Sequence, residues 1–136
     1  MATRLNPYLN FANEAGPAME FYQSVFGGEL TQNTYGELQL SHGPDDDAKI
    51  MHSVLDTPNG LTLMAADSPS DLEPGTNGSI SVSGDDEAEL RGYWDKLSDG
   101  GTVTYPLAVA PWGDTFGMCT DKYGISWLVN IAGSPS

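Results

Sequence analysis

The stretch PWGDTFGMCTDKYGISWLVNI, residues 111–131, has the pattern of two strands joined by a tight turn. Residues 115–120 and 125–131 are rich in apolar, β-branched and aromatic side chains, which is typical of strands. Between them, Asp121-Lys122-Tyr123-Gly124 supplies turn residues, and Gly124 is free to adopt a positive φ. The stretch therefore predicts a β-hairpin that ends the fold.

Working outward, one order of elements occurs twice: a strand, a helix and three strands. Residues 14–26 predict a helix with one apolar face, and Gly27-Gly28 ends it. When the chain is laid on itself at an offset of 72 residues, Phe21-Tyr22 falls on Tyr93-Trp94. This internal repeat predicts two modules of the same architecture. The other expected elements are strands at 7–11, 29–40, 50–57, 61–67, 79–83, 102–110, 115–120 and 125–131, and a helix at 85–98.

The length of 136 residues fits one domain. We expect a single domain over residues 1–136, with module one at about 5–67, a linker at 68–78 and module two at about 79–132. Apolar residues make up 39% of the chain, which indicates a globular core, and no apolar run approaches the roughly 20 residues that span a bilayer. Because the N-terminus also lacks the apolar core of a secretory signal, we expect a soluble, cytoplasmic protein.

The charge balance is strongly acidic, with five Lys and Arg against nineteen Asp and Glu, a net charge of −14. Such a surface repels nucleic acid and anionic lipid, so we expect neither as a partner. It favours a cationic ligand, or it keeps the protein soluble in salt. The single Cys119 excludes an internal disulfide framework, and we interpret it as a passive small residue, not a nucleophile.

Four segments together resemble one known family: residues 7–11, 18–29, 50–53 and 112–131. They are similar to the PhnB-like proteins of the glyoxalase/bleomycin-resistance/dioxygenase superfamily, also called vicinal oxygen chelate. Some of these proteins carry the label 3-demethylubiquinone 3-methyltransferase, although the sequence shows no Gly-rich strand-to-helix turn for S-adenosylmethionine. The resemblance implies an α+β fold in which two tandem β-α-β-β-β modules form U-shaped mixed sheets around a cavity. It also implies a homodimer.

The resemblance implies where a metal would bind, because metal-dependent members carry one ligand in the first and one in the last strand of each module. Those positions fall on Asn6 (Tyr8 in a shifted register), Met64, Ser79 and Asn130. Amide, thioether and hydroxyl groups make a poor site for Ni, Zn, Fe or Mn, which prefer imidazole and carboxylate. We therefore expect no metal and no other cofactor.

Strand alternation predicts which side chains line the cavity. His52 is the candidate for acid–base work, although a core or interface histidine is the simpler interpretation. Asp67 either orients a ligand or forms a turn, and Trp112, at a bend, is suited to stacking a planar ligand. We interpret Asp45-Asp46-Asp47 as a solvated turn. The predicted cavity residues are Asn6, Tyr8, Asn10, His52, Met64, Asp67, Ser79, Ser81, Trp112 and Asn130.

Three functions follow as hypotheses. The first is a protein that binds an unidentified small molecule without the superfamily's metal centre. The second is a resistance protein that sequesters a cationic, bleomycin-type drug, which the net charge of −14 favours. The third is a metal-dependent lyase or dioxygenase, which the four metal positions disfavour. The sequence leaves open whether the protein is an enzyme.

Overall fold

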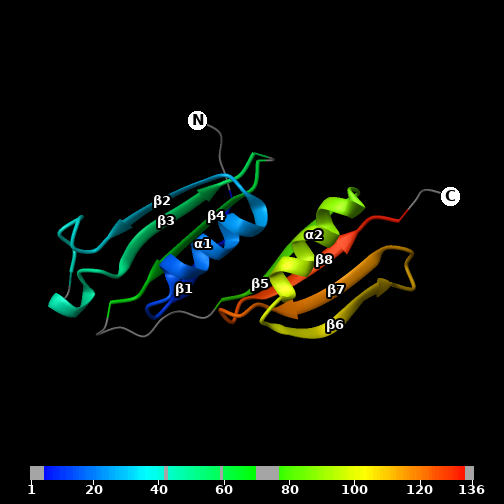
Figure 1. The fold of residues 1–136 in the computed structure, drawn as a ribbon. Coiled ribbons are helices and arrows are strands. Elements are labelled where there is room, and N and C mark those ends of the chain that lie inside the picture. The colour runs from blue at the N-terminus through cyan, green and yellow to red at the C-terminus, as the bar shows by residue number, and fades with distance from the viewer. Residues whose placement is uncertain (1–4, 42, 59, 70–76, 134–136) are drawn as a thin grey trace. The chain divides into compact units, whose positions relative to one another are not determined.

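The computed structural model describes residues 5–41, 43–58, 60–69 and 77–133, so most of the expected linker, with His42 and Asn59, lies outside the described residues. Contacts divide the chain into two compact units, Met1–Asn77 and Gly78–Ser136, which we call module one and module two. Each contains the predicted strand, helix and three strands (Figure 1). In the described residues, neither α-helix is long and apolar enough to cross a membrane.

Module one is a mixed four-stranded sheet in the order β1-β4-β3-β2. The β1 and β4 strands run parallel, while β3 pairs antiparallel with both β4 and β2. The elements are β1 (Tyr8–Phe11), α1 (Ala15–Phe26), β2 (Glu29–Thr34), the 3₁₀ helix η1 (Pro44–Asp46), β3 (Ile50–Asp56) and β4 (Thr62–Asp67).

Module two repeats this topology, with the order β5-β8-β7-β6 and a parallel β5–β8 pair. The predicted closing hairpin is confirmed, because β7 and β8 pair antiparallel from Thr115 opposite Ile131 to Thr120 opposite Ser126. At its turn, Gly124 has φ of +87°. The elements are β5 (Ser79–Gly84), α2 (Glu87–Ser98), β6 (Thr102–Val109), β7 (Thr115–Thr120) and β8 (Ser126–Ile131).

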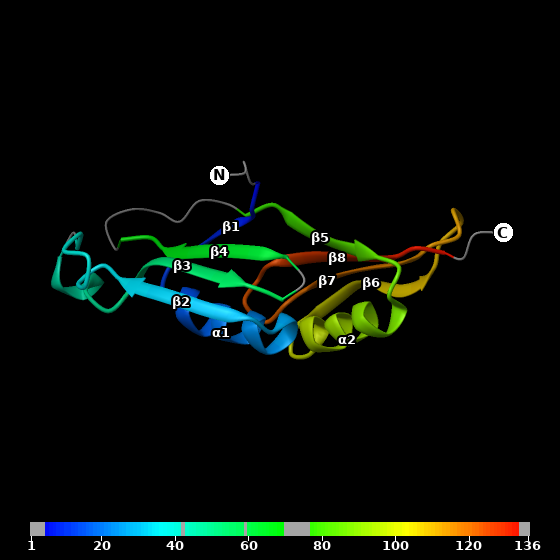
Figure 2. The same cartoon turned by 90° about the horizontal axis from the view of Figure 1, so that it is seen from above.

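Each helix lies along one face of its own sheet (Figures 1 and 2). In module one, Ala18, Tyr22 and Val25 of α1 are buried as predicted. The buried residues alternate along β1, β3, β4, β7 and β8, which leaves an opposite face that we call the open face of each module. The buried strand residues are Leu9, Phe11, Ser53, Leu55, Leu63, Ala65 and Asp67 in module one, and Gly117, Cys119, Trp127, Val129 and Ile131 in module two.

Two predictions about module one need correction. The strand expected at 29–40 ends at Thr34, since the next residues fold into hydrogen-bonded turns that bring Tyr35 into the interior. The solvated turn expected at Asp45-Asp46-Asp47 is wrong for its middle residue. Asp46 lies in η1 and is fully buried, and its carboxylate is 3.8 Å from the Lys49 ammonium. The short 3₁₀ turn directs this side chain inward, and its pairing with a cation offsets part of the cost of burying the charge.

Candidate functional site

The open face of module one carries a row of side chains that crosses all four strands. Tyr8 lies opposite Met64, Met64 opposite Val54, and Val54 opposite Thr31. Tyr8 and Met64 therefore share a face, as the alternation predicted, and both are partly or fully exposed to solvent. Asn6, the position assigned to a metal ligand, precedes β1 and lies two residues away from this row.

His52 lies in the neighbouring row of the same face. It is half-buried, and its partner across the β2–β3 pair is Asn33. Asn10 lies opposite Ala66 in the β1–β4 pair, and its backbone is held by Asn77. The Asn10 N–H donates to Asn77 Oδ1 at 2.8 Å, and Asn77 Nδ2 donates to the Asn10 carbonyl at 3.0 Å. This row offers amides and one imidazole to a ligand, which suits hydrogen bonding.

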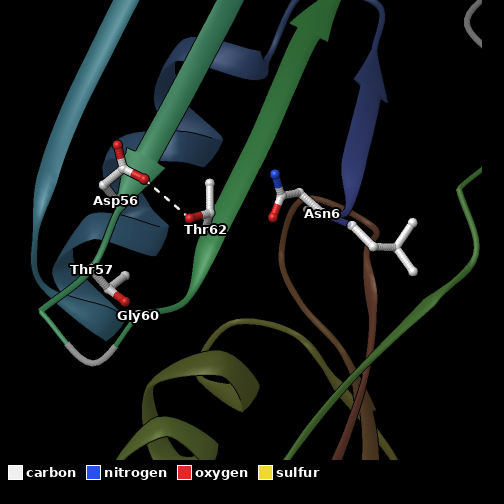
Figure 3. A pocket seen from close by; sticks show the side chains of 6 residues that line it. Asn6, Asp56, Thr57, Gly60 and Thr62 are labelled. Atoms are coloured by element: carbon white, nitrogen blue, oxygen red, sulfur yellow. Dashed lines mark hydrogen bonds between the residues drawn. The ribbon is translucent and has the colours of Figure 1, made fainter. Parts of the chain in front are cut away.

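A pocket of about 470 Å³ opens at the end of the β3–β4 hairpin (Figure 3). Asp56 and Thr62 face each other there, and the Thr62 hydroxyl donates to Asp56 Oδ1 at 3.1 Å. Asn6 lines this pocket as predicted, and strand alternation also assigns Thr62 to the cavity face, whereas the other lining residues were not predicted. The alternation signal extends to Thr62 and Asp56, but both lie at strand ends, where sequence patterns are weakest. The lining residues are Leu5, Asn6, Asp56, Thr57, Gly60 and Thr62.

Asp67 points to the helix side of the sheet, opposite to the face that carries Met64. It is buried, and its two carboxylate oxygens accept hydrogen bonds from the N–H groups of Ala15 at 2.8 Å and Ile50 at 2.9 Å. Its carbonyl accepts the Tyr35 hydroxyl at 2.7 Å. Burial, followed by nearby acidic groups, raises the pKa of Tyr35 above its ordinary value, so this hydroxyl stays a donor. Asp67 therefore joins the start of α1 to the start of β3.

The open face of module two carries Ser79, Ser81 and Asn130, as the alternation predicted. Their positions along the strands differ, because Ser79 lies opposite Ser126 whereas Asn130 lies opposite Ser83. Four residues along a strand span about 13 Å. The two side chains assigned to a metal in this module are therefore too far apart to bind the same ion.

The side chains at the four predicted metal positions do not fit a metal of the superfamily's usual kind. Amide, thioether and hydroxyl donors suit Ni, Zn, Fe and Mn poorly. The Asn130 amide also donates to Asp114 Oδ2 at 3.0 Å, which already fixes its orientation. Across the ranges that the structure describes, no group of three or more His, Cys, Asp and Glu is arranged to hold a metal ion.

Three aromatic residues gather on module two, and we call Tyr105, Trp112 and Phe116 the aromatic patch. The Phe116 ring centroid lies 6.0 Å from that of Tyr105 and 5.7 Å from that of Trp112, both in edge-to-face geometry. Tyr105 is 59% exposed and Trp112 is 62% exposed. The sequence singled out Trp112 by its bend. It missed Tyr105, because β6 has no clear alternation to show which face that residue occupies.

Asp114 lies in the turn between Trp112 and Phe116. Its carboxylate accepts hydrogen bonds from Asn130 Nδ2 at 3.0 Å and from the Gly133 N–H at 2.8 Å. These bonds, the one from Asn130 first, lower the pKa of Asp114 below its ordinary value. Cys119, by contrast, is buried under the sheet, and burial followed by the charge of Asp121 raises its pKa to about 11. A thiol in this state is a poor nucleophile.

Comparison with known proteins places these features in a family. The family model of 3-demethylubiquinone-9 3-methyltransferase matches residues 3–130. Protein PA1353 from Pseudomonas aeruginosa is 32% identical, with a TM-score of 0.85, covering 98% of this chain and 100% of that chain. The PhnB protein from Bacillus cereus is 28% identical, with a TM-score of 0.75, covering 96% of this chain and 100% of that chain.

A third relative, protein YjdN from Escherichia coli strain K12, is 26% identical over 93% of this chain and 94% of its own length. Solved structures from the glyoxalase/bleomycin resistance/dioxygenase superfamily are similar at 15% and 17% identity, a level that shows the fold alone. The predicted family and fold class are confirmed.

Proposed function

Because the chain belongs to the 3-demethylubiquinone-9 3-methyltransferase family, a PhnB-like group with the glyoxalase/bleomycin-resistance fold, we propose that it binds a small organic molecule without the superfamily's usual metal centre. The observation that carries the proposal is the chemistry at Asn6, Met64, Ser79 and Asn130, none of which is an imidazole or a carboxylate. The open faces support it, since they present amides, hydroxyls, an imidazole and exposed aromatic rings.

The first test is metal analysis of tag-free protein purified from medium supplemented with Ni, Zn, Fe and Mn. We expect far less than one metal ion per chain, and one tightly held ion per chain would overturn the proposal. The second test is thermal stabilisation by a metabolite library, measured with and without EDTA. Compounds that raise the melting temperature equally in both conditions support metal-independent binding. Stabilisation that EDTA abolishes would contradict it.

The site also limits what chemistry can be proposed. His52 is our candidate for acid–base work, since an imidazole can both donate and accept a proton, but its cross-strand neighbour Asn33 is an amide and cannot act as an orienting carboxylate. The family description names a methyltransferase, but the sequence shows no Gly-rich turn for S-adenosylmethionine. We therefore propose binding as the function and assign no methyl transfer.

A second candidate function is the sequestering of a cationic, bleomycin-type drug, which the net charge of −14 favours. Titration of the tryptophan fluorescence with bleomycin tests it, because Trp112 is exposed and a bound ring system would alter its emission. An unchanged spectrum at high micromolar drug would overturn this candidate. A metal-dependent lyase or dioxygenase ranks last because its ligands are missing from the predicted positions.

We further propose that the protein is a homodimer. The β2 strand is a sheet edge within module one, and such edges need covering. Size-exclusion chromatography with light scattering tests this, and a monomer of 14.5 kDa as the only species would contradict it.

A further inference from the structure

We propose that the aromatic patch of module two (Tyr105, Trp112 and Phe116), together with Asp114, forms a binding site for a planar organic cation. This inference rests on the proposed function and names the chemical class of the ligand and the residues that hold it. Four observations within module two carry it: the arrangement of the rings, the rigidity of the turn that presents Trp112, the fixed carboxylate, and the edge strand beside them.

The rings contact one another, and two of them are largely exposed. Phe116 lies between Tyr105 and Trp112, and both contacts are edge-to-face. More than half of the surface of Tyr105 and of Trp112 is exposed. A contiguous exposed patch of large apolar side chains is uncommon on a soluble protein and marks an interaction site. Flat rings favour a flat ligand, because stacking contacts the whole ring face.

The turn that presents Trp112 is held by its own backbone. The Ala110 N–H donates to the Asp114 carbonyl at 2.7 Å, and the Gly113 N–H donates to the Ala110 carbonyl at 2.9 Å. Gly113 has φ of +100°, a conformation that favours glycine. The backbone at Trp112 is therefore held before any ligand binds, so less backbone entropy is lost on binding.

Charge determines the class of ligand. Asp114 stands two residues from both Trp112 and Phe116, and its carboxylate is fixed by Asn130, which lies directly opposite Phe116 in the β7–β8 pair. A negative group and the faces of several aromatic rings thus share one edge of the open face. Each attracts a cation, the carboxylate by Coulomb attraction and the rings by their quadrupole. The net charge of −14 adds a long-range attraction of the same sign.

The adjacent β6 strand argues against a protein strand as the occupant. It is an edge of its sheet, but it contains Pro106 and two register shifts, between Val103 and Tyr105 and between Tyr105 and Ala108. Proline and irregular pairing interrupt the row of main-chain donors that another strand would need. The patch therefore binds its ligand through side chains and not through main-chain hydrogen bonds, which suits a small molecule.

The test uses the full chain and proflavine, a planar tricyclic cation whose fluorescence anisotropy reports binding. We expect saturable binding at one site per chain that weakens as NaCl is added. Trp112→Ala should weaken it about tenfold, and Trp112→Phe by less, because tryptophan gives the strongest cation–π attraction. Asp114→Asn should weaken it about fivefold through the loss of the ion pair. Matched controls are Tyr93→Ala and Asp95→Asn on α2, which should leave the affinity within about twofold.

Two further probes separate the contributions. Acridone, a neutral molecule of the same shape, should bind at least about tenfold more weakly than proflavine, and the non-planar cation tetraethylammonium should not compete. Equal affinity for acridone and proflavine would overturn the cation requirement while leaving metal-independent binding intact. Binding that survives Trp112→Ala and Trp112→Phe, with folding confirmed by circular dichroism, would overturn the site. Neither result depends on metal analysis, so failure of this inference is distinguishable from failure of the proposed function.

Discussion

The two modules have the same topology but carry different chemistry on their open faces. In module one Ser53 pairs with Ala65, and in module two Gly117 pairs with Val129. Each residue of the second pair lies 64 positions after its counterpart in the first pair. At this shift, His52 is the counterpart of Phe116. The residue that we consider for acid–base work thus occupies the position that module two uses for the centre of its aromatic patch.

This difference shows which part of the repeat is free to vary. On the helix side, both modules keep buried residues at matching positions, such as Leu63 and Trp127, because packing against a helix requires apolar volume. On the open face, where no helix packs, the polar His52 of module one corresponds to the aromatic Phe116 of module two. We infer that the helix side specifies the module and that the open face specifies the ligand.

The turn between the last two strands also differs between the modules, in the side chain that holds it. Thr57 and Asp121 are counterparts, and each donates its N–H to the carbonyl four residues later and accepts that residue's N–H on its side chain. Asp121 has a further role, because its Oδ2 also accepts the Trp127 indole N–H at 2.8 Å. In module one, Leu63 occupies the position of this tryptophan. A hydroxyl is enough to hold the turn in module one, while the turn in module two requires a second acceptor oxygen, which a carboxylate supplies.

The largest expected effect comes from the second of the two glycines that follow each helix, Gly28 after α1 and Gly101 after α2. A Cβ atom on Gly28 would lie 2.1 Å from the Asp56 carbonyl oxygen, and one on Gly101 would lie 2.1 Å from that of Thr120. Gly28→Ala and Gly101→Ala should each lower the free energy of unfolding by about 3 kcal/mol, because the backbone must move. Urea denaturation measures this, with Gly92→Ala as the control, since a Cβ there meets open space. A small effect in one module alone would show that the two junctions are not equivalent.

The next effect concerns the two turn residues. Asp121→Thr should cost about 2 kcal/mol, because the buried Trp127 N–H loses its acceptor, whereas Thr57→Asp should change stability by less than about 0.5 kcal/mol. Adding Trp127→Leu to Asp121→Thr gives module two the pair found in module one and removes the unsatisfied donor. Urea denaturation of the wild type, Asp121→Thr, Trp127→Leu and the double variant forms a double-mutant cycle. Simple additivity would contradict the coupling of Asp121 and Trp127.

The next difference is that module two has the buried Cys119 at the position that Leu55 occupies in module one. Chemical labelling of the thiol tests its burial. With its pKa raised to about 11 from 9.0, the folded protein at pH 8 should react with a thiol reagent about a hundredfold more slowly than the unfolded chain. The raised pKa favours the protonated thiol in the fold. Its contribution to stability is therefore complete below pH 9.0 and is lost as the pH rises through about 11. Labelling of the native protein at the rate seen in denaturant would refute this.

The smallest effect concerns the carboxylate beside the aromatic patch. Asn130→Ala removes the main cause of the lowered pKa of Asp114, so this pKa should rise toward its ordinary value of 3.8. The lowered pKa stabilises the fold above pH 3.8, and that contribution disappears as the pH falls through the folded-state value. An NMR titration of the Asp114 side chain in both proteins measures the change. Asn10→Ala in module one is the control and should leave it unaltered.

Much of the fold was predictable because the relevant signals are local. The helices, the order of elements and the closing hairpin follow from apolar periodicity and from turn residues such as Gly124. The division of each strand into two faces follows from its period of two, which correctly separated Leu63 and Ala65 from Met64. The family followed from motifs near the two ends, and the family model confirms it.

The relation between the modules was not predictable, because it depends on pairing between distant residues. An offset of 72 aligns the helices, but the last two strands of each module align at 64, since module one has the longer connection between β2 and β3, which contains η1. Met64 and Asn130 were therefore treated as matching positions, whereas the counterpart of Met64 is Leu128 and that of Asn130 is Ala66. Loop length sets this register, and no local pattern records it.

The amino-acid sequence alone thus establishes the elements, their faces and the absence of metal-binding side chains at the expected positions, because each of these is a property of neighbouring residues. Only the tertiary structure shows that Asp67 joins the starts of α1 and β3, that Asp46 is buried, and that Asn130 fixes Asp114 beside an aromatic patch. These features arise where distant segments meet. Their energies depend on burial and hydrogen-bond geometry, which exist only once the strands have paired.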